Sequence, residues 1–179
     1  MSSKKKARRG VIDYRNVKYI NNTAIEDYVS EDPIMSNSLE LIKDILIREK
    51  CKDNNVKFSE ELALNLDKVE SERQRGTSRR DNTVDLVVGL GNKHLLLVEA
   101  KFGSKNMENI ASDIHKKIKH SKELLVSNPN FVSLYDKKLI LLDSNKFEQN
   151  KRKLMNLLHH DVSFYPATAT EFYSTFFDV

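Results

Sequence analysis

The sequence predicts an α/β protein with a mixed central β-sheet flanked by helices on both faces. Three features indicate this class: two aliphatic runs joined by Gly91-Asn92, a long helical periodicity after residue 105, and strand-like runs that alternate with helical ones towards the C-terminus. The chain has 179 residues, 39% of them hydrophobic and 8% aromatic, which suits one enclosed core. We therefore expect a single domain over residues 16–179, preceded by a basic, flexible arm at 1–15.

The first regular element is a helix predicted from 37 to 51. Its aliphatic residues recur on one face, and Asn37 followed by Glu40 has the spacing of a capping box. Residues 11–35 carry few periodic signals, and Asp32-Pro33 marks a backbone break before the helix. Regular structure is therefore expected only after this break.

A strand and a hairpin follow this helix. Leucines alternate with smaller or polar residues at 62–66, which favours a strand, although a short helix after Ser59 fits the same residues. Residues 68–82 are polar, bear charges of both signs and contain a glycine, so a mobile loop is expected there. Residues 83–90 and 94–102 are aliphatic runs on either side of a turn, which predicts two antiparallel strands.

Helices and strands alternate in the C-terminal half. Apolar residues repeat at intervals of three, four or seven from 105 to 127, which predicts a long amphipathic helix with a basic outer face. Residues 138–143 predict a buried strand, 146–159 a helix and 162–165 a short strand. A final helix is expected to start at Thr170.

Charge and cysteine content restrict the classes of function. The net charge of +4 comes largely from five basic residues among the first nine, so the rest of the chain is close to neutral. The single cysteine, Cys51, excludes an internal disulfide framework and favours a reducing, cytoplasmic location. A run of about 18 apolar residues and a secretory N-terminus are both missing, so no membrane partner is expected.

Two short basic stretches lie outside the arm. The first belongs to the helix predicted at 105–127 and contains Lys116, Lys117, Lys119 and Lys122, and the second belongs to the predicted loop and contains Arg73, Arg75, Arg79 and Arg80. Either stretch could bind nucleic acid through its phosphates. A solvated surface without a ligand explains such runs equally well.

Three charged residues stand at the ends of the predicted hairpin strands. Asp85 is followed, after thirteen residues, by Glu99 and then Lys101, at the end of an otherwise aliphatic run. Strand alternation places Glu99 and Lys101 on one face, and the hairpin can bring Asp85 beside them. Charges in such surroundings need an ionic partner or a metal ion. Two carboxylates a few ångströms apart would hold Mg²⁺ or Mn²⁺ and leave coordination positions for water and a substrate phosphate.

This pattern, with Ala100 between Glu99 and Lys101, resembles that of the PD-(D/E)xK, restriction-endonuclease-like nucleases. The resemblance covers residues 37–165 in the order of elements and three side chains as a motif. It implies a restriction-endonuclease-like core in which Asp85 and Glu99 bind the metal and the Ala100 carbonyl joins them. It also implies that Lys101 positions or activates the attacking water. The implied activity is a Mg²⁺-dependent endonuclease that cleaves nucleic acid, with DNA the expected substrate, and leaves a 5′-phosphate.

Some positions stay open within this resemblance. Val84 stands where the family pattern has proline, at a position that commonly varies in the family. Family members often add an acid from the first helix. Glu40 matches that place but could equally cap the helix, and Asp44 is the alternative. Asp81 is a local rival of Asp85, although it precedes the strand.

Other functions fit the same residues. A structure-specific nuclease that acts on Holliday junctions would carry the same motif, and two-strand cleavage by either type of enzyme favours a homodimer. A catalytically inactive relative could bind nucleic acid or protein. A plain interaction domain could hold Asp85, Glu99 and Lys101 as a buried ion-pair network.

Overall fold

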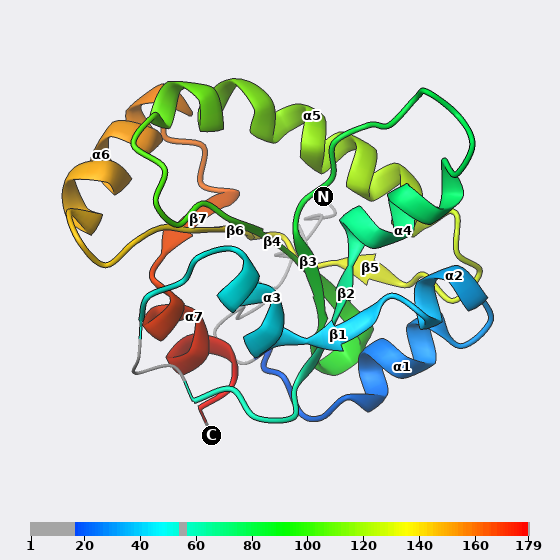
Figure 1. Cartoon of the computed structure of the whole chain (residues 1–179). Helices are drawn as coiled ribbons and strands as arrows, with labels where there is room; N and C mark the ends of the chain where they lie inside the picture. Colours follow the sequence, from blue (N-terminus) through cyan, green and yellow to red (C-terminus); the bar gives the residue numbers. More distant parts are fainter. Residues whose placement is uncertain (1–16, 54–56, 179) are drawn as a thin grey trace, which may run out of the picture.

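Helices enclose one mixed β-sheet in the computed structural model (Figure 1). The structure describes residues 17–53 and 57–178, and the basic arm predicted at 1–15 lies outside the described residues. The described helices are α1 (Thr23–Val29), α2 (Pro33–Ser36), α3 (Ile42–Arg48), α4 (Leu66–Arg73), α5 (Met107–Val126), α6 (Phe147–Leu157), α7 (Ala169–Phe176) and the 3-10 helix η2 (Gly91–Lys93). Among these described helices, none combines the length and apolar character needed to cross a lipid bilayer.

The sheet contains seven strands of mixed direction. They are β1 (Leu39–Leu41), β2 (Leu62–Asn65), β3 (Leu86–Gly89), β4 (His94–Ala100), β5 (Ser133–Leu134), β6 (Lys138–Leu141) and β7 (Phe164–Ala167). The main order is β1-β2-β3-β4-β6-β7, and β5 also pairs with β4. Strands β1 to β4 are antiparallel neighbours, whereas β5 and β6 run parallel to β4, and β7 runs parallel to β6. Helices α5 and α6 lie in the crossover connections that the parallel pairs require.

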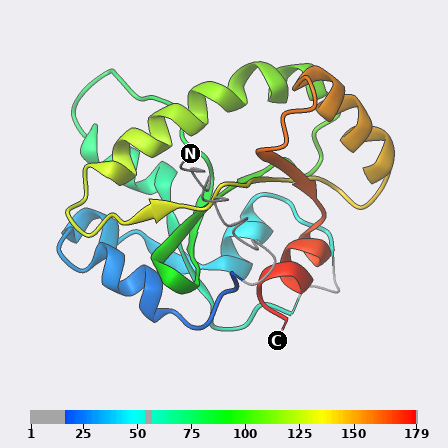
Figure 2. The same ribbon diagram turned by 180° about the vertical axis from the view of Figure 1, so that it is seen from behind.

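Alternate residues of β4 supply the two faces of the core. Leu96 and Val98 belong to a cluster with residues of α3 and α7, whereas Leu95 and Leu97 belong to a cluster with residues of α1, α4 and α5. This alternation is expected of a strand buried on both sides. Both views show α5 and α3 on opposite sides of the sheet (Figures 1 and 2). The prediction of an α/β fold with helices on both faces of a mixed sheet is confirmed.

The hairpin and the C-terminal elements agree with the sequence prediction. Strands β3 and β4 pair antiparallel, with Val87 opposite Leu97, and η2 forms the turn between them. Asn92 accommodates this turn with a φ of 58°, a left-handed conformation that asparagine tolerates. Helix α5 begins after Asn106, whose side chain accepts a hydrogen bond from the Asn109 N–H. Strand β7 begins at residue 164, two residues later than predicted.

The prediction of one helix from 37 to 51 is wrong. This segment contains strand β1 and then the shorter helix α3, and Asn37 ends α2. Glu40 therefore lies opposite Ala63 in a strand pair, not in the first turn of a helix capped by Asn37. The apolar spacing at 39–46 fitted a helix, but pairing of Leu39 and Leu41 with β2 fixes the first three residues as a strand.

Two helices occupy segments that were predicted to be irregular. Helix α4 covers the first part of the loop expected at 68–82, where Val69 is buried and Asn65 caps the helix by accepting from the Lys68 N–H. Helix α1 lies within 11–35 and buries Ile25 and Tyr28. Both helices span about two turns, so too few apolar positions exist for a periodic pattern to stand out.

Candidate metal centre

Asp85, Glu99 and Lys101 meet at one end of the β3–β4 hairpin. Asp85 immediately precedes β3, Glu99 lies near the end of β4, and Lys101 follows that strand. The Ala100 backbone N–H donates a hydrogen bond to Asp85 Oδ2 over 2.6 Å, and Lys101 Nζ lies 2.7 Å from Glu99 Oε1. The pairing of Leu86 with Val98 explains this meeting, because it brings the residues beyond each strand end together.

Helix α5 adds an ammonium group that the sequence analysis counted in a basic stretch but did not place beside Glu99. Lys117 Nζ lies 2.6 Å from Glu99 Oε1, and the Lys117 side chain is 15% exposed. Lys117 follows Ile114 by three residues and precedes Ser121 by four, and both of these are buried on the inner face of α5. Such spacing places the three residues on one side of a helix, which is the sequence signal that could have identified Lys117.

The two carboxylates are buried and close enough to repel each other. Glu99 is 1% exposed, and its Oε2 has no hydrogen-bond partner among the described residues. Burial, followed by the negative charge of Glu99, raises the pKa of Asp85 to about 7. The Ala100 N–H and the charge of Lys117 act in the opposite direction without cancelling this rise. Asp85 is therefore only partly ionised at neutral pH.

Lys101 keeps its positive charge in this environment. Burial lowers the pKa of Lys101, but the charge of Glu99, their hydrogen bond and the charge of Asp85 outweigh burial, so the pKa is raised overall. The side chain is 30% exposed, so the ammonium group reaches solvent. Lys101 is therefore a hydrogen-bond donor and a source of positive charge at neutral pH, and a poor proton acceptor.

The carboxylates fit a hard divalent cation. Glu99 Oε2 is a buried anionic oxygen to which no residue within 17–53 or 57–178 donates a hydrogen bond. A cation shared with Asp85 would use that oxygen and offset the repulsion between the two acids. A cavity of about 190 Å³ beside Glu99, Lys101 and Lys117 offers room for a further group. The Ala100 carbonyl as a third ligand stays a prediction from the resemblance.

The acids expected from the first helix have other surroundings. Glu40 forms ion pairs with Arg48 at 2.9 Å and Lys68 at 3.7 Å. Burial acts to raise the pKa of Glu40, but hydrogen bonds from Arg48 and Asn65, with both basic charges, lower it overall. Asp44 is exposed on α3. That Glu40 or Asp44 serves as a third metal ligand stays a prediction.

Glu49 is a further acid that acts on Asp85, with a smaller effect than Glu99. It ends α3, and its negative charge contributes to the raised pKa of Asp85. The sequence reasoning missed Glu49, because the helix predicted at 37–51 placed its candidate acids in the first two turns.

The predicted phosphate contacts lie next to the candidate metal centre. Lys116 and Lys119 are exposed on α5 and, together with Arg80, line a cavity of about 370 Å³. Lys117 lines both this cavity and the smaller one at Glu99, so the two are neighbours. Arg79 is exposed but does not line either cavity.

Comparisons of the chain with protein-family models, with curated proteins and with solved structures give no match. The resemblance to PD-(D/E)xK nucleases therefore rests on the Asp85, Glu99 and Lys101 motif and on the order of elements around it. A restriction-endonuclease-like core stays a prediction. The α/β fold with a mixed sheet follows from the strand pairing alone.

Proposed function

We propose that this protein is a metal-dependent nuclease that hydrolyses phosphodiester bonds. The observation that carries the proposal is the buried pair of Asp85 and Glu99. Lys101 and Lys117 contact one Glu99 oxygen, and the other has no hydrogen-bond partner in the part of the chain that the structure describes. A divalent cation is a natural partner for that second oxygen. The adjacent cavity is lined by four basic side chains and three acidic ones, and its basic side chains supply a surface on which a polyanion could lie.

Asp85 and Glu99 would hold Mg²⁺ or Mn²⁺. A bound cation of this kind supplies a water of lowered pKa and positive charge for the developing phosphorane. The protein groups have separate tasks. The Ala100 N–H fixes Asp85, and the lysines fix Glu99, so both carboxylates are oriented before substrate arrives.

Lys101 is proposed to orient the attacking water and to stabilise charge on the phosphate oxygens. Its raised pKa favours the ammonium form, which donates hydrogen bonds to a water or a phosphate oxygen. Lys117 is less exposed than Lys101, at 15% against 30%, and is proposed to hold Glu99 in place. Lys101 is thus the more exposed of the two lysines that contact Glu99.

DNA is the proposed polymer, and a 5′-phosphate the proposed product end. Lys116, Lys119 and Arg80 would contact the phosphate backbone, which positions a nucleic acid without reading its sequence. Cleavage of both strands would call for two sites, and a homodimer is the proposed assembly.

Plasmid cleavage tests the activity directly. Purified protein with Mg²⁺ or Mn²⁺ is expected to nick or linearise supercoiled plasmid, and a four-way junction in the same panel separates structure-specific from general cleavage. Asp85→Asn and Lys101→Ala should lower the rate at least 100-fold, as expected for loss of a metal ligand or a charge-stabilising donor. Asp27→Asn and Lys43→Ala change exposed residues of the same types and should leave the rate unchanged. Full activity of either site variant would refute the proposal.

A second candidate function is an inactive module of the same fold that binds nucleic acid or protein. One observation favours it: Lys101 and Lys117 both already neutralise Glu99, so the network is partly complete without a cation. Calorimetric titration with Mn²⁺ separates the two candidates. Binding that Glu99→Gln removes supports the nuclease, whereas absence of binding to the wild-type protein supports the inactive module.

A further inference from the structure

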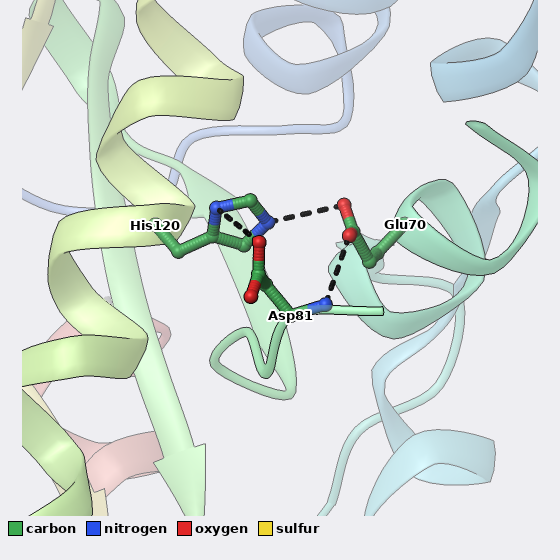
Figure 3. A group of neighbouring side chains, drawn as sticks. All are labelled: Glu70, Asp81 and His120. Carbon is green, nitrogen blue, oxygen red and sulfur yellow. Dashed lines mark hydrogen bonds and ion pairs between the residues drawn. The ribbon is translucent and has the colours of Figure 1, made fainter. Parts of the chain in front are cut away.

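We propose that Glu70, Asp81 and His120 form a second divalent-metal site, distinct from the one at Asp85 and Glu99, that takes a transition-metal ion such as Zn²⁺. Glu70 lies on α4, Asp81 lies between α4 and β3, and His120 lies on α5. Figure 3 shows the imidazole of His120 between the two carboxylates. The inference goes beyond the proposed nuclease function and does not depend on it.

The distances among these groups suit ligands of one ion. His120 Nε2 lies 3.1 Å from Glu70 Oε2, a suitable separation for two ligands of an ion held by Nε2. The 3.9 Å from Asp81 Oδ2 is measured to the other ring nitrogen, Nδ1, which would not bind the same ion. One possible ligand atom from each residue falls within 4.8 Å of the other two. Because zinc–ligand bonds are about 2.0–2.2 Å long, two ligands on a tetrahedral ion lie roughly 3.4 Å apart. Small side-chain adjustments would therefore complete the site.

Two buried atoms that make no hydrogen bond to the described residues could serve as ligands of a cation. Glu70 is 1% exposed, and both Glu70 Oε2 and His120 Nε2 are buried without a hydrogen-bond partner among the described residues. They face each other at 3.1 Å, but not in the geometry of a hydrogen bond. The other Glu70 oxygen accepts from the Asp81 N–H at 3.2 Å, which fixes the carboxylate with Oε2 directed at His120. A metal ion would use the lone pairs on both unpaired atoms.

The donor set selects the class of ion. One imidazole and two carboxylates are typical of zinc and manganese sites, whereas calcium and magnesium sites are built from oxygen ligands. Three protein ligands leave one position for water or another ligand. A ligand at the fourth coordination position would have room, because Asp81 and His120 line the 370 Å³ cavity that is also lined by Lys116 and Lys119.

Such an ion would connect three parts of the fold. Helix α4, the segment before β3 and helix α5 each contribute one ligand. Asp81 precedes Asp85 by four residues, and His120 follows Lys117 by three, so the ion would restrain both chain segments that lead to the candidate metal centre.

Zinc binding by the whole protein tests the site. Because His159 and His160 are adjacent and exposed, the measurements use a His159→Asn, His160→Asn background to remove that alternative. After treatment with a chelator, calorimetric titration with Zn²⁺ of this background carrying also Glu99→Gln, which removes a ligand of the other centre, is expected to show one site per chain. His120→Gln should weaken binding at least tenfold, whereas His115→Gln, an exposed histidine on the same helix, should bind as the background does.

A pair of carboxylate variants provides a second test that does not perturb the core. Asp81 and Glu123 both face His120 Nδ1, at 3.9 and 3.8 Å, and their side chains are 50% and 60% exposed. Asp81→Asn should weaken Zn²⁺ binding at least tenfold, and Glu123→Gln should change it less than threefold. Each removes one negative charge, so a purely electrostatic effect would affect both equally. Circular dichroism confirms that the variants fold.

The result also separates this site from the proposed nuclease centre. Glu99→Gln should keep Zn²⁺ binding at Glu70, Asp81 and His120 while abolishing plasmid cleavage. Absence of Zn²⁺ binding in the background protein, or binding by His120→Gln and Asp81→Asn that is as tight as that of the background protein, would overturn the inference and leave the nuclease proposal intact.

Discussion

The carboxyl group of Asp85 links protonation of the candidate centre to folding stability. An unfolded aspartate has a pKa near 3.8, and burial with the charge of Glu99 raises the pKa of Asp85 to about 7 in the folded protein. The folded state therefore binds this proton more tightly. The resulting stabilisation is fully present below about pH 4 and is lost as the pH rises through 7.

Asp85→Asn is expected to remove this loss of stability at high pH. The substituted amide cannot ionise but keeps an oxygen that can accept from the Ala100 N–H. Relative to wild type, the variant should gain a few kcal/mol of unfolding free energy between pH 5 and pH 8, since each pH unit between two pKa values corresponds to about 1.4 kcal/mol. Urea denaturation without divalent metal measures this, and Asp27→Asn should follow the wild type. Identical pH profiles for wild type and Asp85→Asn would contradict the assigned pKa.

Lys117 and Lys101 are predicted to differ in their contribution to stability. Both contact Glu99 Oε1, but the Lys117 side chain is half as exposed, at 15% against 30%. Lys117→Met should destabilise the protein by about 1–3 kcal/mol, because it leaves a buried carboxylate with one partner, and Lys101→Met should cost less. The double variant should cost more than the sum of the two single changes, since Glu99 then has neither lysine. Urea denaturation of all three variants measures the difference. A larger loss of stability for Lys101→Met than for Lys117→Met would show that the exposure of the two side chains does not decide how strongly each stabilises Glu99.

At the scale of elements, the close approach of α1 to β3 depends on one glycine. A Cβ at Gly89 would lie 2.6 Å from the backbone nitrogen of Ile25 and 3.1 Å from the Ala24 side chain. Gly89→Ala is therefore expected to displace α1 and to cost about 2–3 kcal/mol, as overpacking does. Thermal unfolding measures the loss. Adding Ala24→Gly to Gly89→Ala removes only the contact with the Ala24 side chain, so the double variant should remain as unstable as Gly89→Ala alone. Recovery of stability would show that the backbone at Ile25 can move away.

The elements that could be predicted are those whose pattern is long or carries a turn. The hairpin could be predicted because two aliphatic strands flank Gly91-Asn92, and α5 because its apolar repeat continues for five turns. The short elements could not be predicted in this way. In β1, helical spacing at 39–46 competed with pairing to β2, and only the tertiary partner decides between them.

The same distinction applies to the candidate centre. Asp85, Glu99 and Lys101 could be placed together because hairpin register is local and the strand period is two. Lys117 and Glu49 come from elements whose packing against the hairpin the sequence does not specify. The site of Glu70, Asp81 and His120 is harder still to predict, because it joins three segments, and Glu70 and Asp81 both lie in the stretch that was predicted to be a loop.

At the scale of the whole molecule, the charge is distributed unevenly. Five basic residues precede residue 10, and the remainder is nearly neutral overall, with Lys116, Lys119 and Arg80 gathered at one cavity. Affinity for nucleic acid should therefore have two contributions. The arm would raise general affinity, whereas the cavity residues would position the backbone at the candidate centre.

Salt dependence of DNA binding separates the two contributions. Replacing Lys4, Lys5, Lys6, Arg8 and Arg9 by Gln should weaken binding of a labelled duplex and reduce the slope of log K against log salt, by about 0.9 for each phosphate that the protein no longer neutralises. Cleavage at saturating DNA should be unchanged, because no group of the candidate centre is altered. Lys116→Gln with Lys119→Gln should reduce both the slope and the cleavage rate.

Fluorescence anisotropy over a series of salt concentrations measures the slopes. Lys43→Gln with Lys50→Gln, exposed at the ends of α3, is the control for net charge. If the control lowers the slope as much as the Lys116 and Lys119 variant, binding depends on total charge alone and the cavity has no special part in it.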